Sequence, residues 1–177
     1  GRLPADILAE ELPDNPYAVL SGPTFASEVI RGLPAAATFA TAAPPAVAAV
    51  WAQALKSPTF RPYLGQDVAG VDVAGAVKNV VAIACGIVEG KNLGQNARAA
   101  VMTRGMAEIR RFGASRGAKA ETFLGLSGVG DLMLTCNSMT SRNFSLGHAL
   151  GQGQSLGEIM GGRRTVAEGV ATARALA

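Results

Sequence analysis

Apolar residues run almost without a break from Val71 to Gly90, and this stretch is the most informative part of the chain. It reads VDVAGAVKNVVAIACGIVEG, and away from its two ends the only strongly polar side chains are Lys78 and Asn79. A helix that is apolar around its whole circumference is normally buried. The pattern therefore predicts a buried helix over residues 71–90.

Lys78 has two interpretations within this helix. A buried ammonium group is destabilising by several kcal/mol unless it is paired or its pKa falls, and a lysine of lowered pKa can pass a proton near neutral pH. Alternatively, Lys78 lies on one hydrated stripe of the helix and extends its ammonium group into solvent, as most helical lysines do. The helix by itself does not decide between a functional and a surface lysine.

The pattern before this helix alternates between short amphipathic and short apolar segments. It predicts helices over residues 4–12, 25–31 and 44–55, and strands over residues 17–20, 34–41 and 59–63. Strands and helices that alternate in this way have βαβ spacing. The first part of the chain, residues 1–65, is therefore expected to be α/β.

The pattern after about residue 66 is almost entirely helical. Helices are expected over residues 71–90, 97–112, 121–124, 131–136, 143–150, 156–160 and 166–177. We therefore expect a second, all-α domain over residues 66–177.

Three short polar segments carry candidate binding residues. Gly22 and Thr24 follow a predicted strand, where ligands bind in α/β sheets, although Thr24 could simply cap the next helix. Asp131 follows the small-residue run Ser127-Gly128-Val129-Gly130, and it could either cap a helix or pair with a buried cation such as Lys78.

The third segment is Ser141-Arg142-Asn143, which opens another predicted helix. A guanidinium and a small hydroxyl at a helix N-terminus can bind a phosphate, but Ser141 could also be a cap and Arg142 a surface charge. Glu168, three residues after Thr165, fits a capping box, which is a sufficient structural reason for this glutamate.

Composition and charge narrow the classes of function. The chain has 16 Lys and Arg against 13 Asp and Glu, and the basic residues are scattered, so no nucleic-acid surface is indicated. Cys85 and Cys136 lie in apolar surroundings and are expected to be free thiols in a reducing compartment.

The longest apolar run is broken by Lys78 and is too short to span a membrane, so we expect a cytoplasmic protein. His148 and the cysteines lack ligand spacing, so no metal site is expected.

Six motifs occur in an order that resembles the bacterial NAD(P)-dependent glycerol-3-phosphate dehydrogenase family: LSGPTFASEV, GAVKNVVAIACGI, NARAAVMTRGMAE, GLSGVGDLMLTC, SRNFSLG and TVAEGV. The resemblance covers nearly all of the chain. It implies the tail of a Rossmann-like nucleotide-binding domain, followed by an all-α substrate domain like the C-terminal domain of 6-phosphogluconate dehydrogenase. No G-x-G-x-x-G motif is present near the start, so the resemblance implies a fragment that is inactive by itself.

The resemblance also implies an activity and a role for each candidate residue. The family interconverts dihydroxyacetone phosphate and sn-glycerol 3-phosphate with NAD or NADP, which supplies glycerol 3-phosphate for phospholipid synthesis, and a homodimer is expected. Lys78 would be the catalytic acid/base. The implied substrate-binding residues are Gly22, Thr24, Lys78, Asp131, Ser141, Arg142 and Asn143, and the implied cofactor-binding residues are Ala26, Arg142, Val166 and Glu168.

Two other functions are compatible with parts of the sequence. A related dehydrogenase acting on a 2-hydroxy acid or a phosphogluconate would also use a lysine, but in different flanking motifs, and the Ser141-Arg142-Asn143 segment argues against it. A non-catalytic helical interaction module would suit the Gly- and Ala-rich helices. In such a module, however, a buried Lys78 paired with Asp131 would have no purpose.

Overall fold

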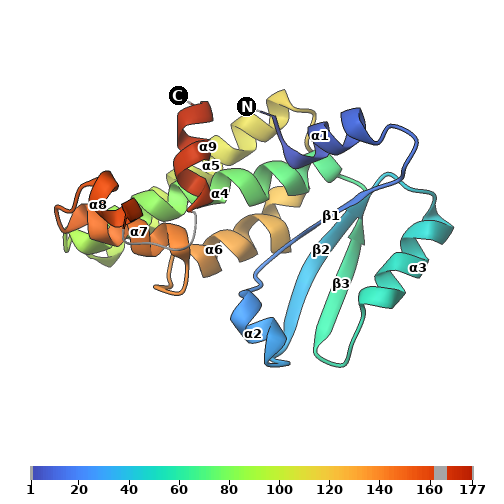
Figure 1. Ribbon diagram of the computed structural model, residues 1–177, viewed down its shortest axis with the longest axis horizontal. Helices are drawn as coiled ribbons and strands as arrows, with labels where there is room; N and C mark the ends of the chain where they lie inside the picture. Colours follow the sequence, from blue (N-terminus) through green and yellow to red (C-terminus); the bar gives the residue numbers. More distant parts are fainter. Residues whose placement is uncertain (1, 162–166, 177) are drawn as a thin grey trace.

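The computed structural model describes residues 2–161 and 167–176. Figure 1 shows a small sheet at one side of the molecule, with helix α3 beside it, and a larger helical body at the other side. The elements that build the sheet side are α1 (Pro4–Glu11), β1 (Ala18–Ser21), α2 (Ala26–Ile30), β2 (Ala35–Thr41), α3 (Pro45–Leu55) and β3 (Phe60–Gly65).

The three strands lie in the order β1-β2-β3, and they do not all run in the same direction. Strands β2 and β3 are parallel, with Ala35 opposite Phe60, and α3 makes the crossover between them. Strands β1 and β2 are antiparallel, with Leu20 opposite Phe39. The βαβ spacing predicted for the whole first part is therefore wrong for β1 and β2. Helix α2 has no buried residue, so it does not cover a sheet face as a crossover helix does.

The rest of the described chain is helical, as predicted. Its elements are α4 (Val68–Gly90), α5 (Gly94–Ser115), a 3-10 turn η1 (Ala120–Leu124), a π turn η2 (Leu126–Gly130), α6 (Asp131–Thr135), α7 (Arg142–Gly151), α8 (Leu156–Gly161) and α9 (Glu168–Leu176). Helix α4 begins three residues before its predicted start, because the Asp67 side chain accepts a hydrogen bond from the Gly70 amide at 2.9 Å and caps it.

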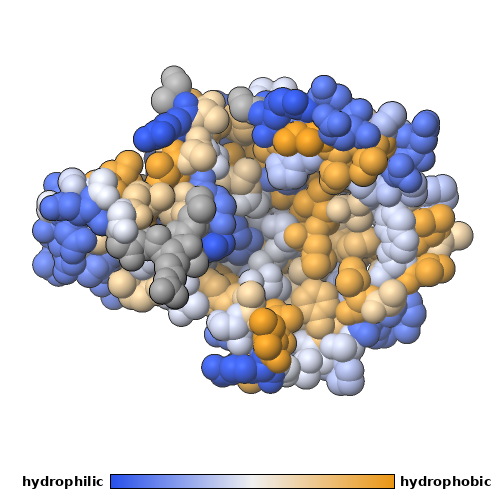
Figure 2. Space-filling model, in the orientation of Figure 1, coloured by the Kyte–Doolittle hydropathy of each residue, from blue (hydrophilic) through white to orange (hydrophobic). Residues whose placement is uncertain are grey.

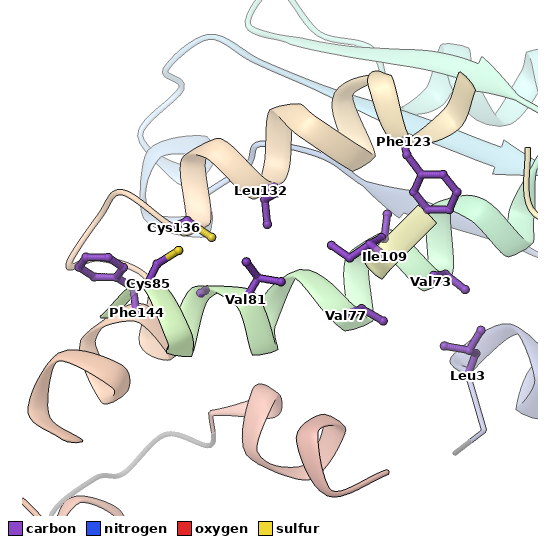
Figure 3. Close-up of a cluster of buried hydrophobic side chains, with 12 residues drawn as sticks. Leu3, Val73, Val77, Val81, Cys85, Ile109, Phe123, Leu132, Cys136 and Phe144 are labelled. Atoms are coloured by element: carbon purple, nitrogen blue, oxygen red, sulfur yellow. The ribbon is translucent and has the colours of Figure 1, made fainter. Parts of the chain in front are cut away.

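Helix α4 is the core of the helical body, and α5, α7 and α9 pack around it. It is long and apolar enough to cross a membrane by length and composition, but 56% of its most apolar window is buried inside the protein. Figure 3 shows its side chains meeting those of α5, η1, α6 and α7 in one apolar cluster. The predicted buried helix is confirmed. The buried members of the cluster are Leu3, Val73, Ala74, Val77, Val81, Ala82, Cys85, Ile109, Phe123, Leu132, Cys136 and Phe144.

Helices α4 and α7 cross at glycines, so that their backbones touch. The pair Gly86 and Gly90 on α4 faces Gly147 and Gly151 on α7, and each pair has the G-x-x-x-G spacing. A methyl group added at Gly151 would lie 2.6 Å from the Ile87 carbonyl oxygen, which is closer than real Cβ atoms come to such a neighbour. This crossing fixes where α7 begins relative to α4.

Candidate functional site

A cavity of about 730 Å³ lies between the sheet side and the helical body. Figure 2 shows the face of the molecule that is hollowed between these two parts. Pockets that bind small molecules commonly have volumes of about 300–1,000 Å³. The polar residues that line this one are Ser21, Thr24, Ser27, Asp72, Lys78, Asn79, Asp131, Thr135, Thr140, Ser141, Arg142, Asn143 and Glu168.

Lys78 and Asp131 form an ion pair in the wall of the cavity. The Lys78 ammonium group donates to Asp131 Oδ2, and the two side chains are 18% and 3% exposed. The lysine therefore does not extend into bulk solvent, and the surface interpretation of Lys78 is wrong. Asp131 is not the cap of α6 either, because Gly130 occupies that position and Asp131 begins the helix. Pairing of Asp131 with a buried cation, one of the two alternatives drawn from the sequence, is confirmed.

Thr135 fixes the orientation of the Asp131 carboxylate. Its hydroxyl donates to Asp131 Oδ1 at 3.1 Å, one helical turn away on α6, while Oδ2 accepts from Lys78. Both carboxylate oxygens are thus engaged, and the Lys78 ammonium group is held at the cavity wall. Such a group can give a proton to an oxygen atom of a bound ligand.

The N-terminus of α7 forms another part of the wall. Ser141 caps the helix, since its hydroxyl accepts from the Phe144 amide at 3.2 Å. Arg142 forms an ion pair with Glu168, and both side chains are about half exposed. Asn143 is buried and accepts from the Gly169 amide at 2.9 Å, which ties the start of α9 to α7. A guanidinium beside a capped helix N-terminus can bind an anionic group.

Of the other predicted site residues, Thr24 and Ala26 line the cavity. Thr24 is not a helix cap, because Phe25 occupies that position and the Thr24 hydroxyl donates to the Gly22 carbonyl oxygen at 3.2 Å. Gly22 is not among the lining residues, and a Cβ atom there would lie 2.8 Å from the Cα atom of Ala37 on β2. Glu168 lines the cavity, while Thr165 and Val166 lie outside the described residues.

Sequence reasoning gave no role to several residues that line this cavity. Thr135 could have been found from its spacing, because residues four apart on a helix are neighbours and Asp131 was already a candidate. Asn79 stood out as a polar residue in an apolar helix but was not assigned a role. Asp72 gave no local signal, because its hydrogen-bond partner is Ala5, which is 67 positions away in the sequence.

Asp72 is a buried carboxylate on α4, only 5% exposed, and it accepts from the Ala5 amide at 2.8 Å. Burial raises the pKa of Asp72 above its ordinary value of 3.8, the hydrogen bond from Ala5 opposes this rise, and the negative charge of Asp6 adds to it. The native state therefore holds a proton on Asp72 more readily than the unfolded chain does. Ionisation of Asp72 destabilises the fold as the pH rises through its pKa in the folded protein.

We expect Asp72→Asn to be at least as stable as the wild type near neutral pH, because asparagine keeps an oxygen acceptor for the Ala5 amide and carries no charge. The advantage in free energy of unfolding should shrink as the pH falls through the raised pKa of Asp72, because the wild-type carboxyl then takes up a proton and loses its charge. Urea unfolding at several pH values measures this difference. An advantage that does not change with pH would contradict the raised pKa.

The two cysteines are free and fully buried, which confirms that part of the prediction. Figure 3 shows the Cys85 thiol on α4 pointing toward the Cys136 thiol at the end of α6. A hydrogen bond between the thiols lowers the pKa of Cys85, and the same hydrogen bond together with burial raises the pKa of Cys136. Among residues 2–161 and 167–176, no group of three or more His, Cys, Asp or Glu side chains is placed to hold a metal ion.

Two family models match the chain. The model of the NAD-dependent glycerol-3-phosphate dehydrogenase N-terminus matches residues 1–47, and the model of the C-terminus of the same family matches residues 67–177.

Curated relatives and solved structures agree with these matches. Glycerol-3-phosphate dehydrogenase [NAD(P)+] 1 of Sphingopyxis alaskensis is 59% identical over 174 residues, which cover 98% of this chain and 52% of the relative. The Novosphingobium aromaticivorans protein, named glycerol-3-phosphate dehydrogenase [NAD(P)+], is 57% identical over 177 residues, which cover 100% of this chain and 54% of the relative. The crystal structure of glycerol-3-phosphate dehydrogenase from Coxiella burnetii superposes with a TM-score of 0.94 at 41% identity, covering 99% of this chain and 55% of that one. The chain spans about half the length of the curated relatives it matches.

Proposed function

Because the chain belongs to the NAD-dependent glycerol-3-phosphate dehydrogenase family, we propose that the full-length protein interconverts dihydroxyacetone phosphate and sn-glycerol 3-phosphate with NAD(H) or NADP(H). The observation that carries the proposal is the Lys78–Asp131 pair in the wall of a cavity that also contains Arg142. A proton donor and an anion-binding side chain in one cavity suit a small phosphorylated ketone. The product would supply glycerol 3-phosphate for phospholipid synthesis.

Lys78 gives the proton in this proposal. In the direction of reduction, its ammonium group protonates the carbonyl oxygen at C2 of dihydroxyacetone phosphate, and in the reverse direction the neutral amine takes the proton from the C2 hydroxyl. A nicotinamide cofactor, when bound, would supply or accept the hydride. Asp131 pairs with the ammonium group of Lys78 and keeps it at the cavity wall, and Thr135 holds Asp131 in place.

The N-terminus of α7 is the proposed binding site of the substrate phosphate. Arg142 offers a guanidinium, and the amides at the start of α7 carry partial positive charge. Asn143 belongs to the same group of substrate residues, with Thr24 across the cavity. Gly22 is proposed to act from outside the cavity wall, by keeping the turn before Thr24 close to β2.

The cofactor residues proposed from the family are Ala26, Arg142, Val166 and Glu168. Ala26, Arg142 and Glu168 line the same cavity as Lys78. These residues fit the nicotinamide end of a dinucleotide. They would hold it beside the substrate, where the hydride must be transferred.

Three further features belong to the same proposal. We divide the chain into residues 1–65 of the nucleotide-binding domain and residues 66–177 of the substrate domain, and the limits of the two family models support this division. Two free buried thiols support a reducing compartment, so we place the protein in the cytoplasm. The proposed assembly is a homodimer, which the mass of the full-length protein in solution would test.

We expect the full-length protein to oxidise NADH or NADPH when dihydroxyacetone phosphate is added, and we expect Arg142→Met to raise KM for that substrate. Hydrogen bonds to charged groups contribute about 1.5–3 kcal/mol, which corresponds to an increase in KM of roughly tenfold to a hundredfold. Steady-state kinetics with both cofactors measure this effect. Arg104→Met is the matched control, because Arg104 is on α5, its side chain is 72% exposed, and it is not among the cavity residues.

Other outcomes would favour the two other functions. Turnover with a 2-hydroxy acid and none with dihydroxyacetone phosphate would replace the proposal with a related dehydrogenase. No turnover with either cofactor, and no binding of inorganic phosphate, would favour an interaction module.

A further inference from the structure

We propose that Asp72 is a positioning residue for the reaction proposed above: by fastening α1 to α4 at the edge of the cavity, it holds the two parts of the site in register. Helix α1 lies within residues 1–47, and Asp72 lies within residues 67–177, so the contact joins the regions matched by the two family models. This inference rests on the proposed function for its effect on turnover, but the contact itself is independent of that function.

Helix α1 needs a cap from another element, because its own N-terminus supplies few hydrogen-bond acceptors. Leu3, at the capping position, has no side-chain oxygen, and Pro4 has no amide hydrogen. The Ala5 amide is left unpaired within the helix, and Asp72 Oδ2 accepts from it at 2.8 Å. Asp72 thus does for α1 what a capping residue normally does, but from a separate helix.

The Asp72–Ala5 contact lies at the wall of the cavity. Pro4 and Asp72 both line the cavity, and Gly75 and Asn79 continue the same face of α4 toward the position of Lys78. Asp72 Oδ1 has no hydrogen-bond partner among the described residues, yet no side-chain oxygen or nitrogen of the described part is both fully buried and unpaired. Oδ1 is therefore accessible from the cavity that Asp72 lines. A change in this contact would move the part of the cavity wall that carries Pro4 relative to Lys78.

Among residues 2–161 and 167–176, few other polar contacts join α1 to the helical body. Arg116 and Asp6 form an ion pair at 3.3 Å, but both side chains are substantially exposed, and such surface pairs contribute little. Ser127 donates to the Ser21 carbonyl oxygen at 2.9 Å, which fastens β1 rather than α1 to the helical body. Leu3 adds an apolar anchor in the core cluster. Within the described part of the chain, Asp72 is therefore the buried polar residue that fixes the position of α1 on α4.

The test compares Asp72→Ala, Asp72→Asn and Asp6→Ala in the full-length protein. We expect Asp72→Ala to lower kcat by about tenfold or more, the effect of about a 1 Å displacement on a preorganised site, while KM for dihydroxyacetone phosphate changes by less than about threefold. The phosphate residues on α7 are untouched, which is why KM is spared. Asp72→Asn keeps an acceptor for Ala5 and should retain at least about half of the wild-type kcat.

Asp6→Ala is the matched control on the same helix. Asp6 accepts from the Leu3 amide at 2.9 Å and is exposed, so its loss weakens α1 but leaves the hydrogen bond between Asp72 and Ala5 in place, and Asp6 is not among the cavity residues. We expect wild-type kcat for this variant. A similar loss in Asp6→Ala, a wild-type kcat in Asp72→Ala, or an equal loss in Asp72→Asn and Asp72→Ala would each overturn the positioning role.

Hydrogen exchange gives a measurement that does not depend on turnover. In Asp72→Ala, amides of α1 should exchange about tenfold faster than in the wild type, while amides of α7 are unchanged, because losing a cap loosens only the capped helix. Unchanged exchange in α1 would overturn the contact itself. Faster exchange in α1, in a protein that does not turn over dihydroxyacetone phosphate, would support the contact and overturn only the proposed function.

Discussion

Replacement of Lys78 by methionine is expected to lower kcat of the full-length protein by about 10³-fold, within the range that general acid catalysis contributes. Methionine has a similar length but no proton to give, so the carbonyl oxygen of the substrate would have to take its proton from water. Residual turnover would come from the binding and orientation of the two reactants, which the variant retains. Single-turnover kinetics with NADH and dihydroxyacetone phosphate measure the loss.

The Lys78→Met variant has a stability problem that needs its own control. Asp131 is 3% exposed, and without Lys78 its charge would be buried and unpaired, which typically destabilises a protein by about 3–5 kcal/mol. The double variant Lys78→Met with Asp131→Asn removes that charge and should recover much of the stability while remaining inactive. If either variant keeps wild-type turnover in a folded state, Lys78 is not the acid.

Gly147→Ala should lower the free energy of unfolding much more than Gly157→Ala does. The added Cβ atom would overlap the Ile83 carbonyl oxygen on α4 and lie 2.8 Å from the carbonyl carbon, and backbone atoms cannot rotate away. Overpacking typically destabilises by about 1–3 kcal/mol, and we expect the upper end of this range despite a gain of roughly 1 kcal/mol from replacing a helical glycine by alanine. Denaturant unfolding measures the loss.

Gly157→Ala is the matched control for this change. Gly157 lies on α8, and a Cβ atom there would meet no atom of another described segment within 4 Å, so the variant should be unchanged or stabilised by up to about 1 kcal/mol. Because α7 carries Arg142 and Asn143, Gly147→Ala should also raise KM for dihydroxyacetone phosphate in the protein that remains folded. Equal stabilities of the two variants would show that α7 can move away from α4 without loss.

The central helix and its ion pair could be predicted from the sequence because both leave strong local signals. A long apolar run predicts a buried helix, and a lysine within it requires a partner of opposite charge. Asp131 follows a run of small residues that permits close approach to such a lysine. The direction of β1 could not be predicted, because an apolar strand has the same local pattern whether its neighbour is parallel or antiparallel. The contact of Asp72 with Ala5 was equally hidden, since it depends on how α1 folds back onto α4.

The glycine crossing of α4 and α7 has a consequence for which ligands the site can accept. Lys78 and Arg142 are carried by these two helices, and the distance between the helices is set by backbone contact at Gly86, Gly90, Gly147 and Gly151. Side chains at a helix interface can change rotamer to admit a longer or shorter molecule, but touching backbones have no such freedom. The spacing between the proposed proton donor and the proposed phosphate site is therefore a fixed dimension of the fold. Among phosphorylated ketones, it should select by the number of bonds between the carbonyl carbon and the phosphate.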